Sequence, residues 1–381
     1  MRRKIIMVIL IFTLTCIIYA KNAYDYYNDA YDLYLAGDYK NAVKLYKKAI
    51  KMKPDFVKSY NKLGLAYIAL KQVDHAIFYY KKAIHTDPNC AEAYYNIGVA
   101  YEIKYKDDTK KAEEAYEKVL KLNNDDYSFV RASLNLAKIY RKQKKFDDGI
   151  LLLREAAKKE PNFAPLYNET GLIYYDSGLY DYAIKSFKKA IEVEEQNKYA
   201  EAATNLGIVY LKQGKLAKAI TQFEEAIKMD DKFPGAHYNY GNALILNGFY
   251  EKAKAHLKKA ILLNPDFKEA YYALGKAHQK LNEFDEATKA YKMALEKDKN
   301  YVNAKNALEE LKQLRLAFRD HIQFKKKAEE GEEGEEVSEE EAELTEEQLA
   351  AKKKAKEQEE DVEDLRLPED KPTPEEGEEE K

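Results

Sequence analysis

The chain has 381 residues, of which 45% are hydrophobic, and its 64 Lys and Arg nearly balance its 67 Asp and Glu. The net charge of −3 hides two segments of opposite sign. Residues 328–381 hold 25 acidic and 7 basic residues, a net charge of −18, which leaves +15 for residues 1–327. The only cysteines are Cys16 and Cys90, so removal of an N-terminal leader would exclude an intramolecular disulfide.

The N-terminus has the layout of a secretory signal peptide. A basic start at residues 2–4 precedes a mostly apolar run over residues 5–20, which is short for a membrane-spanning helix and ends on the small residue Ala20. We therefore predict that residues 1–20 are a signal peptide and that the protein is secreted, periplasmic or otherwise in the cell envelope. The alternatives are an inner-membrane anchor formed by residues 5–20, lipidation at Cys16, and a cytosolic protein with an apolar leader.

A pattern of small residues returns eight times between residues 23 and 301, at a spacing of about 34 residues. A second small residue follows the first after 12 residues, or after 14 in the third copy, and a third position lies seven residues later. This period indicates a solenoid of stacked units. The first of these positions is occupied, in chain order, by Ala30, Gly64, Gly98, Ala137, Gly171, Gly207, Gly241 and Gly275.

The spacing within one copy predicts two helices. In the second copy, apolar or small residues recur at i, i+3, i+4 and i+7 from Tyr60, and again at i, i+4, i+7 and i+8 from Ala76. Pro88 then closes the unit, because proline cannot continue a helix but tolerates the start of the next. With inserts at 127–129 and 198–199, the copies span residues 23–56, 57–90, 91–126, 130–163, 164–197, 200–233, 234–267 and 268–301.

Two further segments follow the repeats. Residues 302–322 predict one more amphipathic helix, which would cover the exposed face of the last repeat, as terminal repeats require. Residues 323–381 predict a disordered acidic tail, since its glutamate runs cannot bury enough apolar surface to fold.

The repeats resemble the tetratricopeptide repeat family over about 280 residues, with residues 93–101 (AYYNIGVAY) and 46–50 (YKKAI) close to the consensus of that family. The resemblance implies an all-α, right-handed superhelical solenoid of antiparallel helix pairs. In this family the first helix of each pair lines a concave groove that receives extended peptides or partner helices. The resemblance and the register together place these residues in the groove: Tyr24, Tyr27, Asn28, Tyr31, Tyr34, Tyr95, Asn96, Asn135, Asn168, Tyr175, Asn205, Tyr238, Asn239, Asn242 and Tyr272.

Two patterns within this set suggest binding. Asn28 and four later asparagines share one repeat position and would form a discontinuous ladder of amides, which can pair with the backbone of any extended chain. The alternative is that asparagine is only a common consensus residue there. The tyrosines of the first copy form a stripe at helical spacing, which would serve as an interface anchor or pack on a capping segment. The asparagines that share the repeat position of Asn28 in the ladder are Asn96, Asn135, Asn205 and Asn239.

No residue pattern indicates catalysis. The six histidines lack paired metal-ligand spacing, and no phosphate-binding glycine loop occurs. His237 and His278 replace tyrosines of other copies and are interpreted as packing residues. We therefore predict a protein that is not an enzyme and has no cofactor and no metal.

These observations predict a scaffold of the cell envelope that binds a protein or peptide, acidic or extended, in its groove. The acidic tail would either gate a basic groove or only keep the protein soluble. One alternative is an accessory or targeting subunit of a separate envelope enzyme or of a secretion or assembly machinery. A minor alternative is nucleic-acid binding through the basic body, against which the leader and the acidic tail argue.

Overall fold

The computed structural model describes residues 21–106, 108–194 and 199–314. The predicted signal peptide, the predicted acidic tail and residues 315–322 of the predicted terminal helix lie outside these residues. Within the described residues every regular element is a helix, and the helices follow one another in antiparallel pairs. The predicted all-α solenoid of helix pairs is therefore confirmed. No helix in the described ranges is long and apolar enough to cross a membrane.

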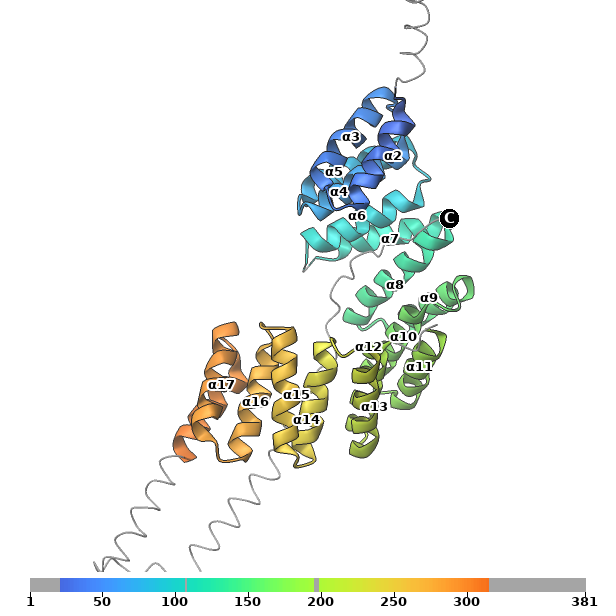
Figure 1. Cartoon of the computed structure of the whole chain (residues 1–381). Helices are drawn as coiled ribbons and strands as arrows, with labels where there is room; N and C mark the ends of the chain where they lie inside the picture. Colours follow the sequence, from blue (N-terminus) through green and yellow to red (C-terminus); the bar gives the residue numbers. More distant parts are fainter. Residues whose placement is uncertain (1–20, 107, 195–198, 315–381) are drawn as a thin grey trace, which may run out of the picture. The chain divides into compact units, whose positions relative to one another are not determined.

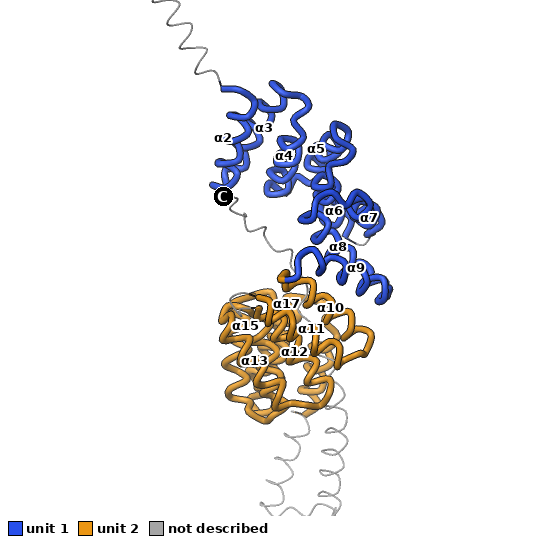
Figure 2. Tube along the Cα trace, turned by 90° about the vertical axis from the view of Figure 1, so that its right-hand side faces the viewer, with its two compact units in different colours: residues 1–161, 372–381 blue, residues 162–371 orange. Residues whose placement is uncertain are grey.

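The helices belong to two compact units that divide between Pro161 and Asn162, and Figure 2 shows the two units in different colours. The pairs of unit 1 are α2 (Ala23–Leu35) with α3 (Tyr39–Met52), α4 (Val57–Ala69) with α5 (Val73–Thr86), α6 (Ala91–Lys104) with α7 (Lys110–Leu122), and α8 (Asp126–Lys142) with α9 (Phe146–Lys159). The pairs of unit 2 are α10 (Ala164–Asp176) with α11 (Tyr180–Val193), α12 (Ala200–Lys212) with α13 (Leu216–Met229), α14 (Pro234–Leu246) with α15 (Tyr250–Leu263), and α16 (Lys268–Lys280) with α17 (Phe284–Lys297) (Figure 1).

Glycine at the repeated small position of six of the eight pairs lets a large side chain of the second helix lie directly against the first. A Cβ atom on Gly64 would lie 2.3 Å from the Tyr80 ring, and one on Gly98 would lie 2.5 Å from the Tyr116 ring. Both rings are fully buried. The small residue and the aromatic ring are therefore one packing unit, and the same contact recurs in other pairs, with Gly171 against Phe187, Gly207 against Phe223, Gly241 against Leu257 and Gly275 against Tyr291.

In every described pair except the third, the turn contains a position with a left-handed backbone conformation. Gly178 occupies it between α10 and α11 with φ of 77°, a conformation that glycine adopts without a steric penalty. In the second and fourth pairs Lys71 and Lys144 hold the same position with φ of 58° and 60°. A side chain is unfavourable in this region, so these two turns store strain that the glycine turns avoid.

Helix α8 departs from the repeat register. The sequence places residues 127–129 between two copies as an insert, but α8 begins at Asp126 and continues for 17 residues. Asp125 caps it, because its carboxylate accepts a hydrogen bond from the backbone N–H of Ser128 at 3.0 Å. Ser128 and Phe129 are buried. The insert therefore lengthens the first helix of the fourth pair by about one turn instead of forming a linker.

The chain continues as a helix after α17. Residues 302–314 are helical, and they place Ala307 and Leu311 against Ala287 and Tyr291 of α17. Leu311 is 1% exposed. The described part of the predicted terminal helix thus covers apolar side chains of the last repeat.

Candidate functional site

The candidate site lies in unit 1, where α2 meets the start of α4. Asn22 fixes the start of α2, because its side chain accepts hydrogen bonds from the backbone N–H groups of Tyr24 (2.8 Å) and Asp25 (3.1 Å). Asp25 in turn accepts a hydrogen bond from the Asn22 backbone N–H at 2.7 Å. This reciprocal capping fixes the first turn of α2 and thereby positions Tyr24 and Tyr27, the first two residues predicted to line the groove.

An open depression of about 380 Å³ lies at this place. Three of the predicted groove residues, Tyr24, Tyr27 and Asn28, line it from α2, and Lys58 lines it from α4. Asn28 and Lys58 are exposed, whereas Tyr27 is half-buried. The remaining lining residues are Asp55, Phe56 and Val57.

Phe56 forms the apolar floor of this depression. It is buried, and its ring centroid lies 4.9 Å from that of Tyr24 and 5.1 Å from that of Tyr27. Lys53 donates a hydrogen bond of 2.5 Å to the Tyr24 hydroxyl, and this bond raises the pKa of the Lys53 ammonium. The site therefore combines fixed aromatic surface with a cation, an exposed amide and an exposed ammonium group, which suits an extended peptide with mixed side chains.

The other two tyrosines of the stripe pack differently. Lys62 of α4 places its ammonium group 5.9 Å from the ring centroid of Tyr31, and this ammonium lies 3.8 Å from a carboxylate oxygen of Glu92. Tyr34 lies edge-on against Tyr39 with ring centroids 5.3 Å apart. Tyr31 thus extends the candidate site toward α6, while Tyr34 contributes to packing within its own pair.

The amide ladder is mostly enclosed. Asn28 is exposed and Asn135 half-buried, but Asn96, Asn205 and Asn239 are at most 5% exposed. This corrects the expectation that the ladder is a surface feature. Successive first helices contact one another, as α6 contacts α8 and α12 contacts α14.

The enclosed amides of unit 2 bind one another. The Asn205 amide donates a hydrogen bond of 3.0 Å to the buried side chain of Asn168, which donates one of 2.8 Å to Glu201. Asn239 donates to the backbone oxygen of Gly235 at 2.9 Å. Four of the predicted groove asparagines each have one amide atom that is buried without a hydrogen-bond partner within the described residues. These atoms are Asn96 Nδ2, Asn205 Oδ1, Asn239 Oδ1 and Asn242 Nδ2.

The remaining predicted aromatic residues pack inside the solenoid. Tyr238 is buried against Phe267, with ring centroids 4.8 Å apart. Tyr95, Tyr175 and Tyr272 are half-buried. Burial raises the pKa of Tyr175 to about 12, so its hydroxyl stays protonated. The rings next to the half-buried tyrosines are those of Tyr116 beside Tyr95, Tyr180 beside Tyr175, and Tyr291 and Tyr301 beside Tyr272.

The positive charge of unit 1 does not collect along the groove helices. The first helices of its pairs hold seven basic and six acidic residues, whereas the second helices hold 14 basic and seven acidic residues. Helix α2, which forms the candidate site, contains three aspartates and no lysine or arginine. In unit 1 the expectation of a basic groove is therefore corrected, because most of the basic excess lies on the second helices.

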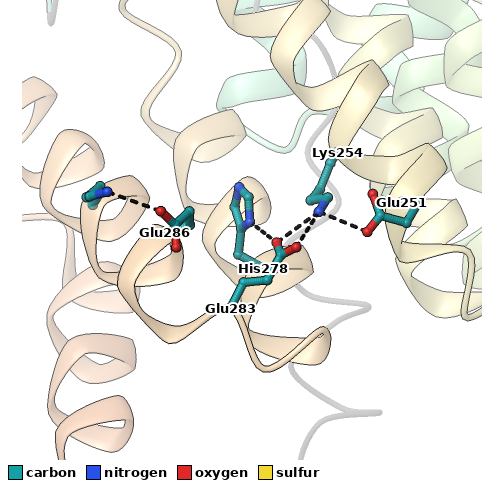
Figure 3. A network of polar contacts seen from close by, with 6 residues as sticks. Glu251, Lys254, His278, Glu283 and Glu286 are labelled. Atoms are coloured by element: carbon teal, nitrogen blue, oxygen red, sulfur yellow. Dashed lines mark hydrogen bonds and ion pairs between the residues drawn. The ribbon is translucent and has the colours of Figure 1, made fainter.

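Sequence reasoning missed a polar network between the last two pairs. Lys254 of α15, 9% exposed, donates hydrogen bonds of 2.8 and 2.9 Å to the Glu283 carboxylate and one of 3.0 Å to Glu251 (Figure 3). His278 of α16 also bonds Glu283. Hydrogen bonds from Lys254 and then His278 hold the pKa of Glu283 below its usual value.

Buried His237 and half-buried His256 also form hydrogen bonds. His237 of α14 places its Nδ1 3.1 Å from Nδ1 of His256 on α15, and its Nε2 3.0 Å from the backbone oxygen of Asp231. Burial lowers the pKa of both imidazoles. His237 and His278 are thus buried, and each also bonds a polar partner. Among the described residues, no group of three or more His, Cys, Asp or Glu side chains could hold a metal ion.

Comparison with known protein families assigns one type of repeat to successive segments of the chain. Family models described as Tetratricopeptide repeat match residues 57–90, 104–165, 162–232 and 268–301, and one described as TPR repeat matches residues 30–71 and 241–282.

Three known proteins are similar to the chain over part of their length. The probable UDP-N-acetylglucosamine–peptide N-acetylglucosaminyltransferase SPINDLY of Solanum lycopersicum is 29% identical over 104 residues, which are 27% of this chain and 11% of that protein. The photosystem I assembly protein Ycf3 of Prochlorococcus marinus is 26% identical over 95 residues, 25% of this chain and 54% of that protein. The crystal structure of the APC/C hetero-tetramer Cut9–Hcn1 matches with a TM-score of 0.55 at 16% identity, over 74% of this chain and 54% of that one.

Proposed function

Because the chain belongs to the tetratricopeptide repeat family, whose folds serve protein–protein interaction, we propose that it is a non-enzymatic scaffold that holds an extended segment of a partner protein at the α2–α4 depression. The observation that carries this proposal is that Tyr24, Tyr27 and Asn28 converge around a concave, solvent-open surface with a buried aromatic floor. Fixed aromatic surface anchors a ligand at a small entropic cost.

The chemistry of the depression defines the segment that fits it. The Lys58 ammonium and the Asn28 amide are able to donate hydrogen bonds to a ligand, and Tyr24, Tyr27 and Phe56 offer apolar surface. An extended segment with an apolar side chain next to a carboxylate or to free backbone carbonyls satisfies both. Asp55 on the rim disfavours a run of many acidic residues, so the partner is acidic only locally.

The proposal is tested with peptides selected from a random displayed library on the full chain. Tyr24→Ala removes the exposed ring of the site, and we expect it to weaken the selected peptides by about tenfold or more, as for a central aromatic contact. Tyr182→Ala is a matched control, because Tyr182 on α11 is 54% exposed and Tyr24 is 53% exposed. If both substitutions weaken peptide binding equally, or if neither weakens it, the depression is rejected as the binding site.

The predicted cellular location is also part of this proposal. A secretory leader over residues 1–20 supports a cell-envelope location, either after cleavage at Ala20 or with residues 5–20 as an anchor. N-terminal sequencing of the protein purified from its own cells decides between the two. A chain that starts at Lys21 indicates a cleaved leader, an intact N-terminus in the membrane fraction indicates an anchor, and an intact chain in the soluble cytoplasm rejects the envelope setting.

A second candidate function is that of an accessory or assembly subunit. The relative Ycf3 is named for the assembly of photosystem I, and SPINDLY is named as a transferase, of which the match covers only the repeat part. An accessory role predicts that the partner is another subunit and that the two purify as a stoichiometric complex. A partner that dissociates within seconds would favour transient peptide binding instead.

A further inference from the structure

Helices α3 and α5, the second helices of the first two pairs of unit 1, expose lysines on their outer sides. Each helix buries one side, with Tyr46 fully buried on α3 and Tyr80 fully buried on α5. Helical spacing places five exposed lysines on the sides that remain. They are Lys47, Lys48 and Lys51 of α3 and Lys81 and Lys82 of α5, called the α3–α5 lysine face below.

Lys47 connects the outer sides of the two helices. Its ammonium group lies 5.5 Å from the ring centroid of Tyr67. Hydrogen bonds to the hydroxyl group of Tyr67 and, less strongly, to that of Tyr79 raise the pKa of Lys47. Tyr79 belongs to α5, so the outer sides of α3 and α5 lie next to each other and form one surface.

The acidic groups beside this surface are already paired. Asp74 is the only acidic residue of α5, and it forms an ion pair with Lys104 of α6. Asp38 precedes α3 and interacts with Lys40 and Lys44, so these two lysines are not counted in the face. None of the five lysines of the face forms an ion pair within the described residues. The face therefore presents five ammonium groups without compensating carboxylates.

The α3–α5 lysine face ends at the next second helix. Helix α7 carries Glu114 and Glu117 among its lysines, and Glu114 is exposed. The uncompensated charge is therefore confined to the first two pairs of unit 1.

An exposed aromatic ring lies within the face. Phe78 of α5 is 53% exposed, and the ammonium group of Lys82 lies 5.7 Å from its ring centroid. Exposed aromatic rings among lysines are typical of helices that lie in the interface of an anionic bilayer. There the ring enters the headgroup boundary, while the ammonium groups stay at the lipid phosphates.

We propose that the α3–α5 lysine face binds the surface of an anionic lipid bilayer, with the Phe78 ring in the headgroup region. Each lysine near such a surface strengthens binding by about fivefold. Burial of the ring adds a contribution that does not depend on charge.

The proposed cell-envelope location favours a bilayer over nucleic acid as the partner, and the inference rests on the proposed function only for this choice. The face belongs to second helices, whereas the α2–α4 depression is lined by α2 and the start of α4. The two proposals therefore fail separately, because Tyr24→Ala changes peptide binding and substitutions in the face change vesicle binding.

The test measures co-sedimentation of the full chain with lipid vesicles. One set contains phosphatidylglycerol and phosphatidylcholine in a ratio of about 3 to 7, and the other contains phosphatidylcholine alone. Salt at about 0.1 M limits attraction to charges within about 10 Å of the lipid. We expect binding to the anionic vesicles to be at least about tenfold tighter. Equal binding to both sets, or binding to neither, overturns the proposal.

Neutralised variants separate the face from the rest of the chain, because residues 1–20 are the same in all of them. We expect neutralisation of the face to weaken binding to anionic vesicles by at least about tenfold, and the control to change it by less than about twofold. Equal losses would indicate non-specific attraction and overturn the proposal. Lys47 is retained because it contacts Tyr67. The face variant carries Lys48→Gln, Lys51→Gln, Lys81→Gln and Lys82→Gln, and the control, with the same net charge and also at exposed lysines, carries Lys188→Gln, Lys218→Gln, Lys258→Gln and Lys292→Gln.

The aromatic ring has a matched control in the same unit. Leu151 of α9 occupies the repeat position of Phe78 and is 57% exposed. Phe78→Ala is expected to weaken binding to anionic vesicles by about fivefold, and Leu151→Ala to leave it unchanged. Equal effects of the two substitutions would show that the ring does not enter the bilayer and would overturn the proposal.

Two further readouts complete the test. Circular dichroism melting within a few degrees of the wild type shows that the variants fold. If the fourfold face variant melts lower, the pair Lys51→Gln and Lys82→Gln replaces it. A single-stranded oligonucleotide is then added to the vesicle-bound chain at an equal concentration of phosphate. Vesicle binding that persists supports the proposal, whereas displacement from the vesicles assigns the face to nucleic acid and overturns it.

Discussion

Gly98 and Tyr116 form a single packing unit: a Cβ atom on Gly98 would lie 2.5 Å from Cε1 of the buried Tyr116 ring. The ring cannot retreat, since its hydroxyl donates a hydrogen bond of 2.6 Å to Glu102 and accepts one of 3.2 Å from Asn135. This contact joins the two helices of the third pair and connects them to the fourth. The close approach on which the repeat depends is therefore a property of two residues, one small and one large.

Gly98→Leu is expected to destabilise the protein by about 1–3 kcal/mol, because the added side chain overpacks the crossing of α6 and α7. Urea denaturation followed by circular dichroism measures the loss. Ala217→Leu on the exposed side of α13 is the control and should leave the midpoint unchanged. A Gly98→Leu midpoint equal to that of the wild type would show that the crossing is not tightly packed.

The left-handed turn residues predict substitutions of opposite sign. Lys144→Gly should stabilise the protein by about 0.5–1 kcal/mol, since it relieves a side chain held at φ of 60°. Gly178→Ala should destabilise it by about 1 kcal/mol, since the added Cβ enters the left-handed region at φ of 77°. Thermal melting at one pH compares both variants with the wild type, and shifts of the same sign would contradict the argument.

The histidine pair of α14 and α15 predicts a pH-dependent stability. Burial lowers the pKa of His237 and His256 in the folded state, so the unfolded chain binds more protons below its own histidine pKa of about 6.5. Stability should then fall as the pH drops from about 6.5 toward the lower folded pKa. His237→Tyr restores the tyrosine of other copies and should flatten this part of the curve of melting temperature against pH. An unchanged slope in the variant would rule out the pair as its source.

The Glu283 carboxylate predicts a second, more acidic window. Hydrogen bonds from Lys254 and His278 lower its folded pKa, so its contribution to stability is present above the unfolded pKa and is lost as the pH falls through the folded pKa. Glu283→Gln should lower the free energy of unfolding at neutral pH. The difference between variant and wild type should become smaller below about pH 4. Glu296→Gln, at an exposed position of α17, serves as the control. A constant gap at all pH values would mean that the carboxylate does not titrate with folding.

The fold could be predicted because its causes lie within one repeat. Helical spacing from Tyr60 and Ala76, and a small residue at Gly64, are local patterns that any one copy displays. The candidate site could be predicted only in part. Tyr24, Tyr27 and Asn28 were found because the first repeat has no earlier helix in the described chain to cover them.

The remaining site features depend on contacts between repeats. Burial of Asn96 and Asn205 follows from how closely successive first helices approach, which single-repeat patterns do not contain. The bond between Lys254 and Glu283 joins residues 29 positions apart, on a helix and in a turn of the next pair. The distribution of positive charge between the two layers of helices in unit 1 also required the assignment of basic residues to first or second helices, since the total over residues 1–327 does not separate the two layers.

Binding of an extended peptide at the α2–α4 depression should protect the backbone amides of the residues around it. Hydrogen exchange of the full chain, measured by mass spectrometry with and without a library-selected peptide, tests it most directly. We expect slower exchange of amides in residues 23–35 and 53–62, and no change in α11. Protection confined to second helices, or spread evenly over the repeats, would contradict it.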